Sequence, residues 1–140
     1  MAFRIIFPDT GNIVEVRLSG ALGFDTIRKM HDALYFSAAW QTGMNVLTII
    51  DPGVELIGID TKTMRTDPRD EVERLQDVRG PDFKAAIVAD NDAIEGTLRE
   101  WRAMPFVDGV YDIEIFPDAG RAREWLQEFE ADWPEFRRPA

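Results

Sequence analysis

The stretch Asn45-Val46-Leu47-Thr48-Ile49-Ile50-Asp51, followed by Pro52-Gly53, decides how the rest of the chain is organised. Its apolar residues fall on both alternating positions, so a strand formed here would be buried on both faces. Proline presets φ and glycine permits positive φ, so the last three residues predict a turn. The stretch therefore predicts a central parallel strand whose carboxyl end opens into a loop, where open α/β sheets gather their ligands.

Strands and helices are predicted to alternate on both sides of this strand. Further strands are expected at 3–7, 13–18, 84–89 and 111–116, and helices at 26–40, 68–78, 92–104 and 119–129. The first helix is expected to be capped by Asp25 and to turn a face that ends with Ala38 toward the sheet. A turn-rich segment at 8–12 predicts that the first two strands form an antiparallel hairpin. The later alternation predicts right-handed crossovers, and so an α/β fold with a mostly parallel five-stranded sheet, an antiparallel first strand and about four helices.

Polar alternation predicts where each strand lies in the sheet. The strand at 84–89 has none and is expected near the centre, whereas 111–116 alternates and is expected at an edge. The residues of the two central strands expected in the core are Val46, Leu47, Ile49, Ile87 and Val88. The strand at 13–18 carries Glu15 and Arg17 on one face, which predicts that this face is half solvated. The crossover helices should lie mainly on one face of the sheet and leave the other partly open.

Composition is that of one globular domain. The chain has 140 residues, 45% hydrophobic and 30% charged, which predicts a single domain at 1–140 with a tail at 130–140. The absence of cysteine excludes disulfides, thiolate catalysis and zinc–cysteine sites. The apolar run at 3–7 is too short for a signal peptide, and no segment has the length of a membrane span, so we expect a cytoplasmic protein.

Charge argues against a nucleic-acid partner. The net charge is −10, and residues 71–140 hold most of the acidic excess. A phosphate backbone would be repelled by this half of the chain.

No constellation of residues predicts a reaction, a metal or a cofactor. His31 is the only histidine, and neither Ser19 nor Ser37 lies in a Gly-x-Ser-x-Gly elbow, so a surface or partly packed helical histidine is favoured over a general base. Asp51 lacks the acidic cluster and lysine that a phosphoacceptor needs, and is interpreted as a turn aspartate. Residues 90–92 resemble the start of a calcium loop, but Ile94 cannot coordinate, so a helix cap is favoured.

Three segments resemble a known superfamily. They are Val14-Glu15-Val16-Arg17-Leu18-Ser19-Gly20, Val46-Leu47-Thr48-Ile49-Ile50-Asp51 and Ile113-Glu114-Ile115-Phe116-Pro117-Asp118. Together they resemble the STAS-like superfamily, and within it the small bacterial SpoIIAA-like proteins. This group includes anti-sigma-factor antagonists and shares a βα-superhelix fold with CRAL-TRIO lipid-transfer domains. The resemblance implies a non-enzymatic regulatory or protein-interaction domain.

One departure from this superfamily bears on regulation. Antagonists carry an Asp-Ser-Ser/Thr-Gly motif in which a serine is phosphorylated, and the nearest match here, Asp60-Thr61-Lys62-Thr63, has no serine. This difference argues against phospho-regulated partner switching and leaves phosphorylation of Thr61 or Thr63 open.

Two functions remain as alternatives. For an interaction domain, the expected contact surface is the loop after the central strand, with Asp51, Gly53, Asp60, Thr61 and Thr63. A small-ligand or lipid-binding module would instead use the apolar loop, with Val54, Leu56, Ile57 and Ile59, to line a pocket. We also expect a homodimer, formed through the more open sheet face or the apolar loop at 54–59. An apolar cavity beside Leu56 and Ile59 would favour the ligand-binding alternative.

Overall fold

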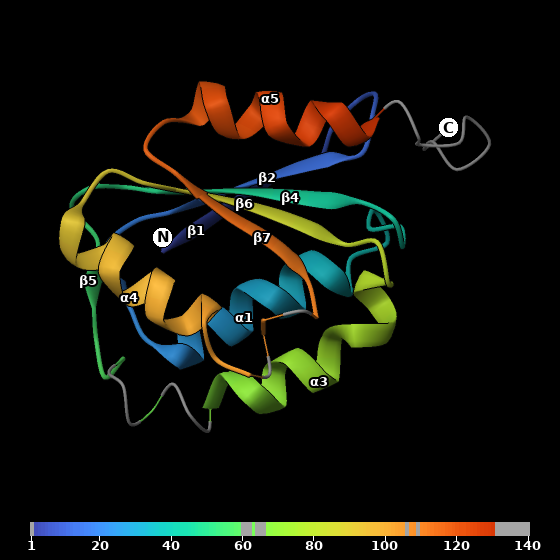
Figure 1. Ribbon diagram of the computed structural model, residues 1–140. Coiled ribbons are helices and arrows are strands. Elements are labelled where there is room, and N and C mark those ends of the chain that lie inside the picture. Colours follow the sequence, from blue (N-terminus) through green and yellow to red (C-terminus); the bar gives the residue numbers. More distant parts are fainter. Residues whose placement is uncertain (1, 60–62, 64–66, 106, 109, 131–140) are drawn as a thin grey trace.

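The computed structural model describes residues 2–59, 63, 67–105, 107–108 and 110–130 (Figure 1). Within these residues, four helices of eleven to thirteen residues pack on a five-stranded sheet. This is the predicted α/β class. The expected tail at 131–140 lies outside the described residues.

The main sheet has the strand order β1-β2-β4-β6-β7. Its strands are β1 (Phe3–Ile6), β2 (Ile13–Leu18), β4 (Asn45–Ile50), β6 (Lys84–Ala89) and β7 (Asp112–Phe116). β1 runs antiparallel to β2, and the other neighbouring pairs are parallel. The predicted sheet is therefore confirmed, with β4 at its centre and β7 at one edge.

A second, two-stranded sheet extends beyond the carboxyl ends of β2 and β4. It pairs β3 (Ala21–Leu22) with β5 (Glu55–Leu56) in parallel. β5 lies within the apolar segment 54–59, for which the sequence left a loop or a short extended piece open. β3 was not predicted, because two residues are too few to show a period.

Three helices cover one face of the sheet and one covers the other. The three are α1 (Phe24–Tyr35), α3 (Asp67–Arg79) and α4 (Asp92–Arg102), and the fourth is α5 (Ala119–Glu130) (Figure 1). The crossover helices thus share a face, as predicted. The opposite face is less open than expected, because α5 packs on its apolar residues.

Helix ends differ from the predictions at α1 and agree better at α4. α1 begins after Gly23 and ends at Tyr35, so Asp25 lies in its first turn and is not its cap. The predicted extension to Trp40 is wrong, and Ala38, expected to face the sheet, is exposed. α4 is capped as expected within 90–92, where the Asn91 side chain accepts hydrogen bonds from two backbone N–H groups of the first turn.

Each face of the sheet has its own core, and the predicted core residues divide between them. Val46 and Ile87 are buried under α1, α3 and α4, whereas Leu47 and Val88 are buried under α5. Ile49, also predicted in the core, is only half-buried beside α5. Successive residues of a strand therefore pack into opposite layers of the molecule.

The prediction that Glu15 is exposed is wrong. Its carboxylate pairs with Arg17 at 3.0 Å on the same strand and with Arg123 of α5, and only 9% of the residue is accessible. Arg17 is exposed, as predicted. The alternation of β2 was interpreted as a solvated face, but it marks a charged contact that α5 covers.

Candidate functional site: an apolar cavity under the helix layer

A cavity of about 410 Å³ lies between the sheet and the layer of α1, α3 and α4. Its lining is mostly aliphatic and aromatic and includes Leu22, Leu34, Ile50, Ile87, Leu98 and Trp101. β4 and β6 supply its floor through the side chains that point away from α5.

The cavity opens between α1 and α3. Most of the lining is buried or half-buried, but Asp25, Arg28 and Asp70 are exposed. The first two lie on α1 and the third on α3. A ligand would therefore meet charged groups at the entrance and apolar groups inside.

Two of the predicted binding residues belong to this lining. Leu56 lies on β5 and Ile59 follows it, and both are half-buried against the cavity. Backbone hydrogen bonds from Glu55 to Gly20 (3.0 Å) and from Ile57 to Leu22 (2.7 Å) hold this segment beside β3. The expectation is wrong for the other two residues of this loop: Val54 is buried but does not line the cavity, and Ile57 points away from it and is 55% exposed.

The other predicted binding residues do not line the cavity where the structure describes them. Asp51 is exposed, and its Oδ1 accepts a hydrogen bond of 2.8 Å from the Gly53 N–H, as expected of a turn aspartate. The Thr63 hydroxyl donates to the Gly58 carbonyl at 3.0 Å. Asp60 and Thr61 lie outside the described residues.

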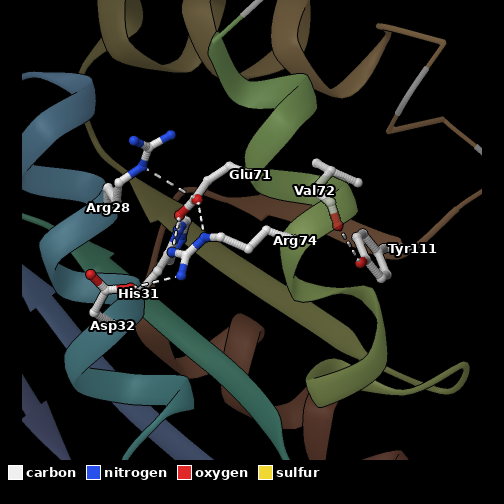
Figure 2. A network of polar contacts seen from close by, with 7 residues as sticks. All are labelled: Arg28, His31, Asp32, Glu71, Val72, Arg74 and Tyr111. Atoms are coloured by element: carbon white, nitrogen blue, oxygen red, sulfur yellow. Dashed lines mark hydrogen bonds and ion pairs between the residues drawn. The ribbon is translucent and has the colours of Figure 1, made fainter.

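A network of charged side chains joins α1 to α3 at the entrance (Figure 2). Glu71 Oε2 lies 2.6 Å from His31 Nδ1, and Arg74 binds both oxygens of the same carboxylate at 2.7 and 3.0 Å. Arg28 approaches Glu71 at 3.6 Å, and Arg74 also pairs with Asp32 at 2.8 Å. Glu71 is therefore held by three partners, two of them on α1.

The protonation of His31 and Glu71 follows from burial and from these contacts. Burial raises the pKa of Glu71, but hydrogen bonds with His31 and Arg74 outweigh this effect and lower the pKa to about 2. Burial lowers the pKa of His31 below its usual value of 6.5, and the bond to Glu71 only partly opposes the shift. At neutral pH a neutral His31 thus donates its Nδ1–H to an ionised Glu71.

The network places His31 beside a carboxylate but beside no serine of the described lining. His31 is partly packed, with 14% of its side chain exposed, which is one of the two placements that the sequence left open. A general base needs a nucleophile within hydrogen-bond reach. The described lining contains no serine, and its hydroxyls belong to Thr48, Thr97 and Tyr35.

Arg79 is the feature of the site that sequence reasoning missed. It is the last residue of α3, only 8% of it is accessible, and it lines the cavity. Its guanidinium carbon lies 4.8 Å from the ring centroids of Tyr35 and Phe83 and 5.1 Å from that of Tyr111. A basic residue before Gly80-Pro81 looks like an ordinary helix end, and two of the three rings, those of Tyr35 and Tyr111, come from distant parts of the sequence.

No group of three or more histidine and acidic side chains in the described part of the chain could hold a metal ion. Among the helices described, none is both long and apolar enough to cross a membrane. Comparisons with protein-family models, curated proteins and solved structures gave no match to the chain.

Proposed function

We propose that this chain is a binding protein that holds a small apolar or amphipathic molecule in the cavity under α1, α3 and α4. The observation that carries the proposal is the cavity itself. Its volume of about 410 Å³ and mostly apolar lining fall in the range of small-molecule sites, about 300–1,000 Å³. The half-buried Leu56 and Ile59 give the apolar loop a place in that lining.

The energetic cost of an empty cavity supports occupancy. Protein interiors contain few voids larger than a water molecule. Because the cavity opens toward solvent between α1 and α3, water would occupy it in the absence of a ligand. Water fills such a space well only where two to four polar partners surround each molecule, and this lining is mainly aliphatic and aromatic.

The proposed family relationship is compatible with this function. A STAS-like chain related to CRAL-TRIO domains would share its α/β arrangement with lipid-transfer proteins, although a shared fold does not fix function. The described lining offers no serine beside His31, which supports a binding role over catalysis. The chain would then act by carrying or sensing its ligand.

A second candidate, a regulatory or protein-interaction domain, is favoured by Ile57. This side chain is 55% exposed on the loop that follows the central strand. Exposed apolar residues on loops are common at interfaces. The two functions are compatible if the partner recognises the loop, because neighbouring residues of the same segment face the cavity.

Native mass spectrometry of the protein purified from its own host tests the primary proposal. We expect a retained small-molecule mass that disappears in Leu56→Asp, because a carboxylate would enter the apolar lining. Ile57→Asp is the matched control, since it places the same charge on the next residue, outside the cavity. Circular dichroism must show both variants folded. Loss of the adduct in both variants, or in neither, would count against the cavity as its location.

A further inference from the structure

Arg79 is a buried cation at one end of the cavity. Within the described residues it is the only buried basic side chain, and the other buried polar or charged residues are Asn12, Glu15, Asn45 and Glu71. Burying an ionised group is costly unless a partner or hydrogen bonds compensate it. Arginine also stays charged at every physiological pH. Its environment should therefore contain a compensating anion.

The described residues do not supply that anion. Arg79 forms no ion pair with any of them, and its Nε has no hydrogen-bond acceptor there. The nearest candidate within the lining, Glu71, is taken by His31, Arg74 and Arg28. Burial raises the pKa of Tyr35, so this phenol stays neutral beside Arg79.

The three aromatic rings compensate the charge only in part. Cation–π attraction favours a guanidinium beside Tyr35, Phe83 and Tyr111, and the hydroxyls of Tyr35 and Tyr111 accept hydrogen bonds from it. Among the described residues, however, no carboxylate pairs with Arg79 and its Nε–H has no acceptor. A planar guanidinium matches a carboxylate, which binds it through two parallel hydrogen bonds. The aromatic cage formed by these three rings therefore lacks the negative charge and the acceptor for the Nε–H that a ligand carboxylate would provide.

The cavity extends from Arg79 toward apolar side chains at the other end of the sheet. Arg79 and Phe83 lie at the amino end of β6, whereas Leu56 and Ile59 follow the carboxyl end of β4. β4 and β6 are parallel, so these groups mark opposite ends of the cavity. Six strand residues span about 20 Å, which is the length scale available to an extended ligand.

On the basis of the proposed function, we propose that the ligand is an amphipathic carboxylate, such as a fatty acid, whose carboxylate pairs with Arg79. Its apolar chain lies under α1 and α4 along β4 and β6, toward Leu56 and Ile59. The headgroup completes the coordination of the buried guanidinium, and the chain fills the aliphatic part of the cavity. An uncharged lipid would fill the same space but leave Arg79 without its partner.

Isothermal titration calorimetry with laurate and with lauryl alcohol tests this assignment, because the two probes share a chain and differ in charge. We expect laurate to bind the wild-type protein about tenfold to a hundredfold more tightly, the usual value of a charge-assisted pair. In Arg79→Met the preference should vanish, while lauryl alcohol still binds. Arg79→Lys should keep a reduced preference, because lysine retains the charge without the planar fork.

Arg99→Met is the control, because Arg99 lies on α4, is exposed and pairs with Glu95 at 2.8 Å outside the cavity. It should behave like the wild type. Should Arg79→Met fail to fold, Arg79→Lys decides the matter, because an unchanged preference for laurate in this variant would place the carboxylate elsewhere.

The outcomes separate the two proposals. Equal binding of both probes to the wild type would overturn the role of Arg79 and leave the binding function standing. Binding of neither probe would overturn the proposed function for this ligand class. A preference for laurate that survives in Arg79→Met would place the carboxylate elsewhere.

Discussion

His31 Nδ1 lies 2.6 Å from Glu71 Oε2, and this contact fastens α1 to α3 across the entrance of the cavity. The carboxylate is also bound by Arg74 from its own helix. The two helices that form the entrance are thus held together by a charged network whose central residue is Glu71 (Figure 2).

Glu71→Gln should destabilise the fold by about 1–3 kcal/mol, because it removes the charge that His31 and Arg74 share within a partly buried site. Glu73→Gln is the matched control on the same helix. Glu73 is 63% exposed in a longer pair with Arg69, and its loss should cost less than about 0.5 kcal/mol. Urea denaturation measures both. Equal losses would show that the network at Glu71 does not stabilise the fold.

Acid should weaken the contact between α1 and α3 in two stages. The folded-state pKa of His31 lies below its ordinary value of 6.5, so between these two pKa values the unfolded chain binds more protons than the folded one. Stability is therefore lost as the pH falls from above 6.5 toward the folded-state pKa. The folded-state pKa of Glu71 is about 2 against an ordinary 4.5, so its stabilisation is complete above 4.5 and is lost as the pH falls toward 2.

The difference between wild type and His31→Gln isolates the first stage from the other acidic groups. We expect the wild type to lose more free energy of unfolding than the variant between about pH 8 and pH 5.5. Parallel pH profiles for the two proteins would contradict the assignment of a neutral, buried His31.

Side-chain truncation at two positions of β4 should cost different amounts of stability, because the two residues are buried to different degrees under α5. Leu47 is fully buried under α5, so Leu47→Ala should cost about 2–5 kcal/mol. Ile49 is only half-buried on the same face, so Ile49→Ala should cost clearly less. Chemical denaturation compares the two. A larger loss at Ile49 would contradict the packing of α5.

Self-association through the apolar loop remains a prediction from the sequence. Ile57 is 55% exposed there, so Ile57→Asp should shift a wild-type dimer toward monomer by placing a charge in the interface. Light scattering at micromolar concentration provides the measurement. Wild-type protein that is already monomeric would contradict the prediction.

The sequence predicted the sheet well because its signals were local. The unbroken apolar run of β4 and the similar run of β6 gave both strands and their central position. The Asn91 side chain likewise caps α4 by accepting hydrogen bonds from backbone N–H groups two and three residues further along the chain. In each case, the deciding interactions lie within a few residues of the signal.

The site could be predicted only in part because its contacts are long-range. Leu56 and Ile59 were identified from an apolar loop, and both line the cavity. His31 and Glu71 are forty residues apart and share no motif. Arg79 gains its aromatic cage only after α1 and α3 pack together. Glu15 was misjudged for the same reason, since its partner Arg123 comes from α5.

A methyl-resolved NMR titration with laurate tests the central claim most directly, because β6 provides its own control. Ile87 faces the cavity and its neighbour Val88 faces α5, so one strand reports on both layers. If laurate binds in the cavity, the chemical shifts of the methyl groups of Ile87 and Leu22 should change saturably. Those of Val88 and Leu47 should stay nearly unchanged. Unperturbed methyl groups at Ile87 and Leu22, or equal shifts on both faces of the sheet, would contradict a ligand-binding cavity under the helix layer.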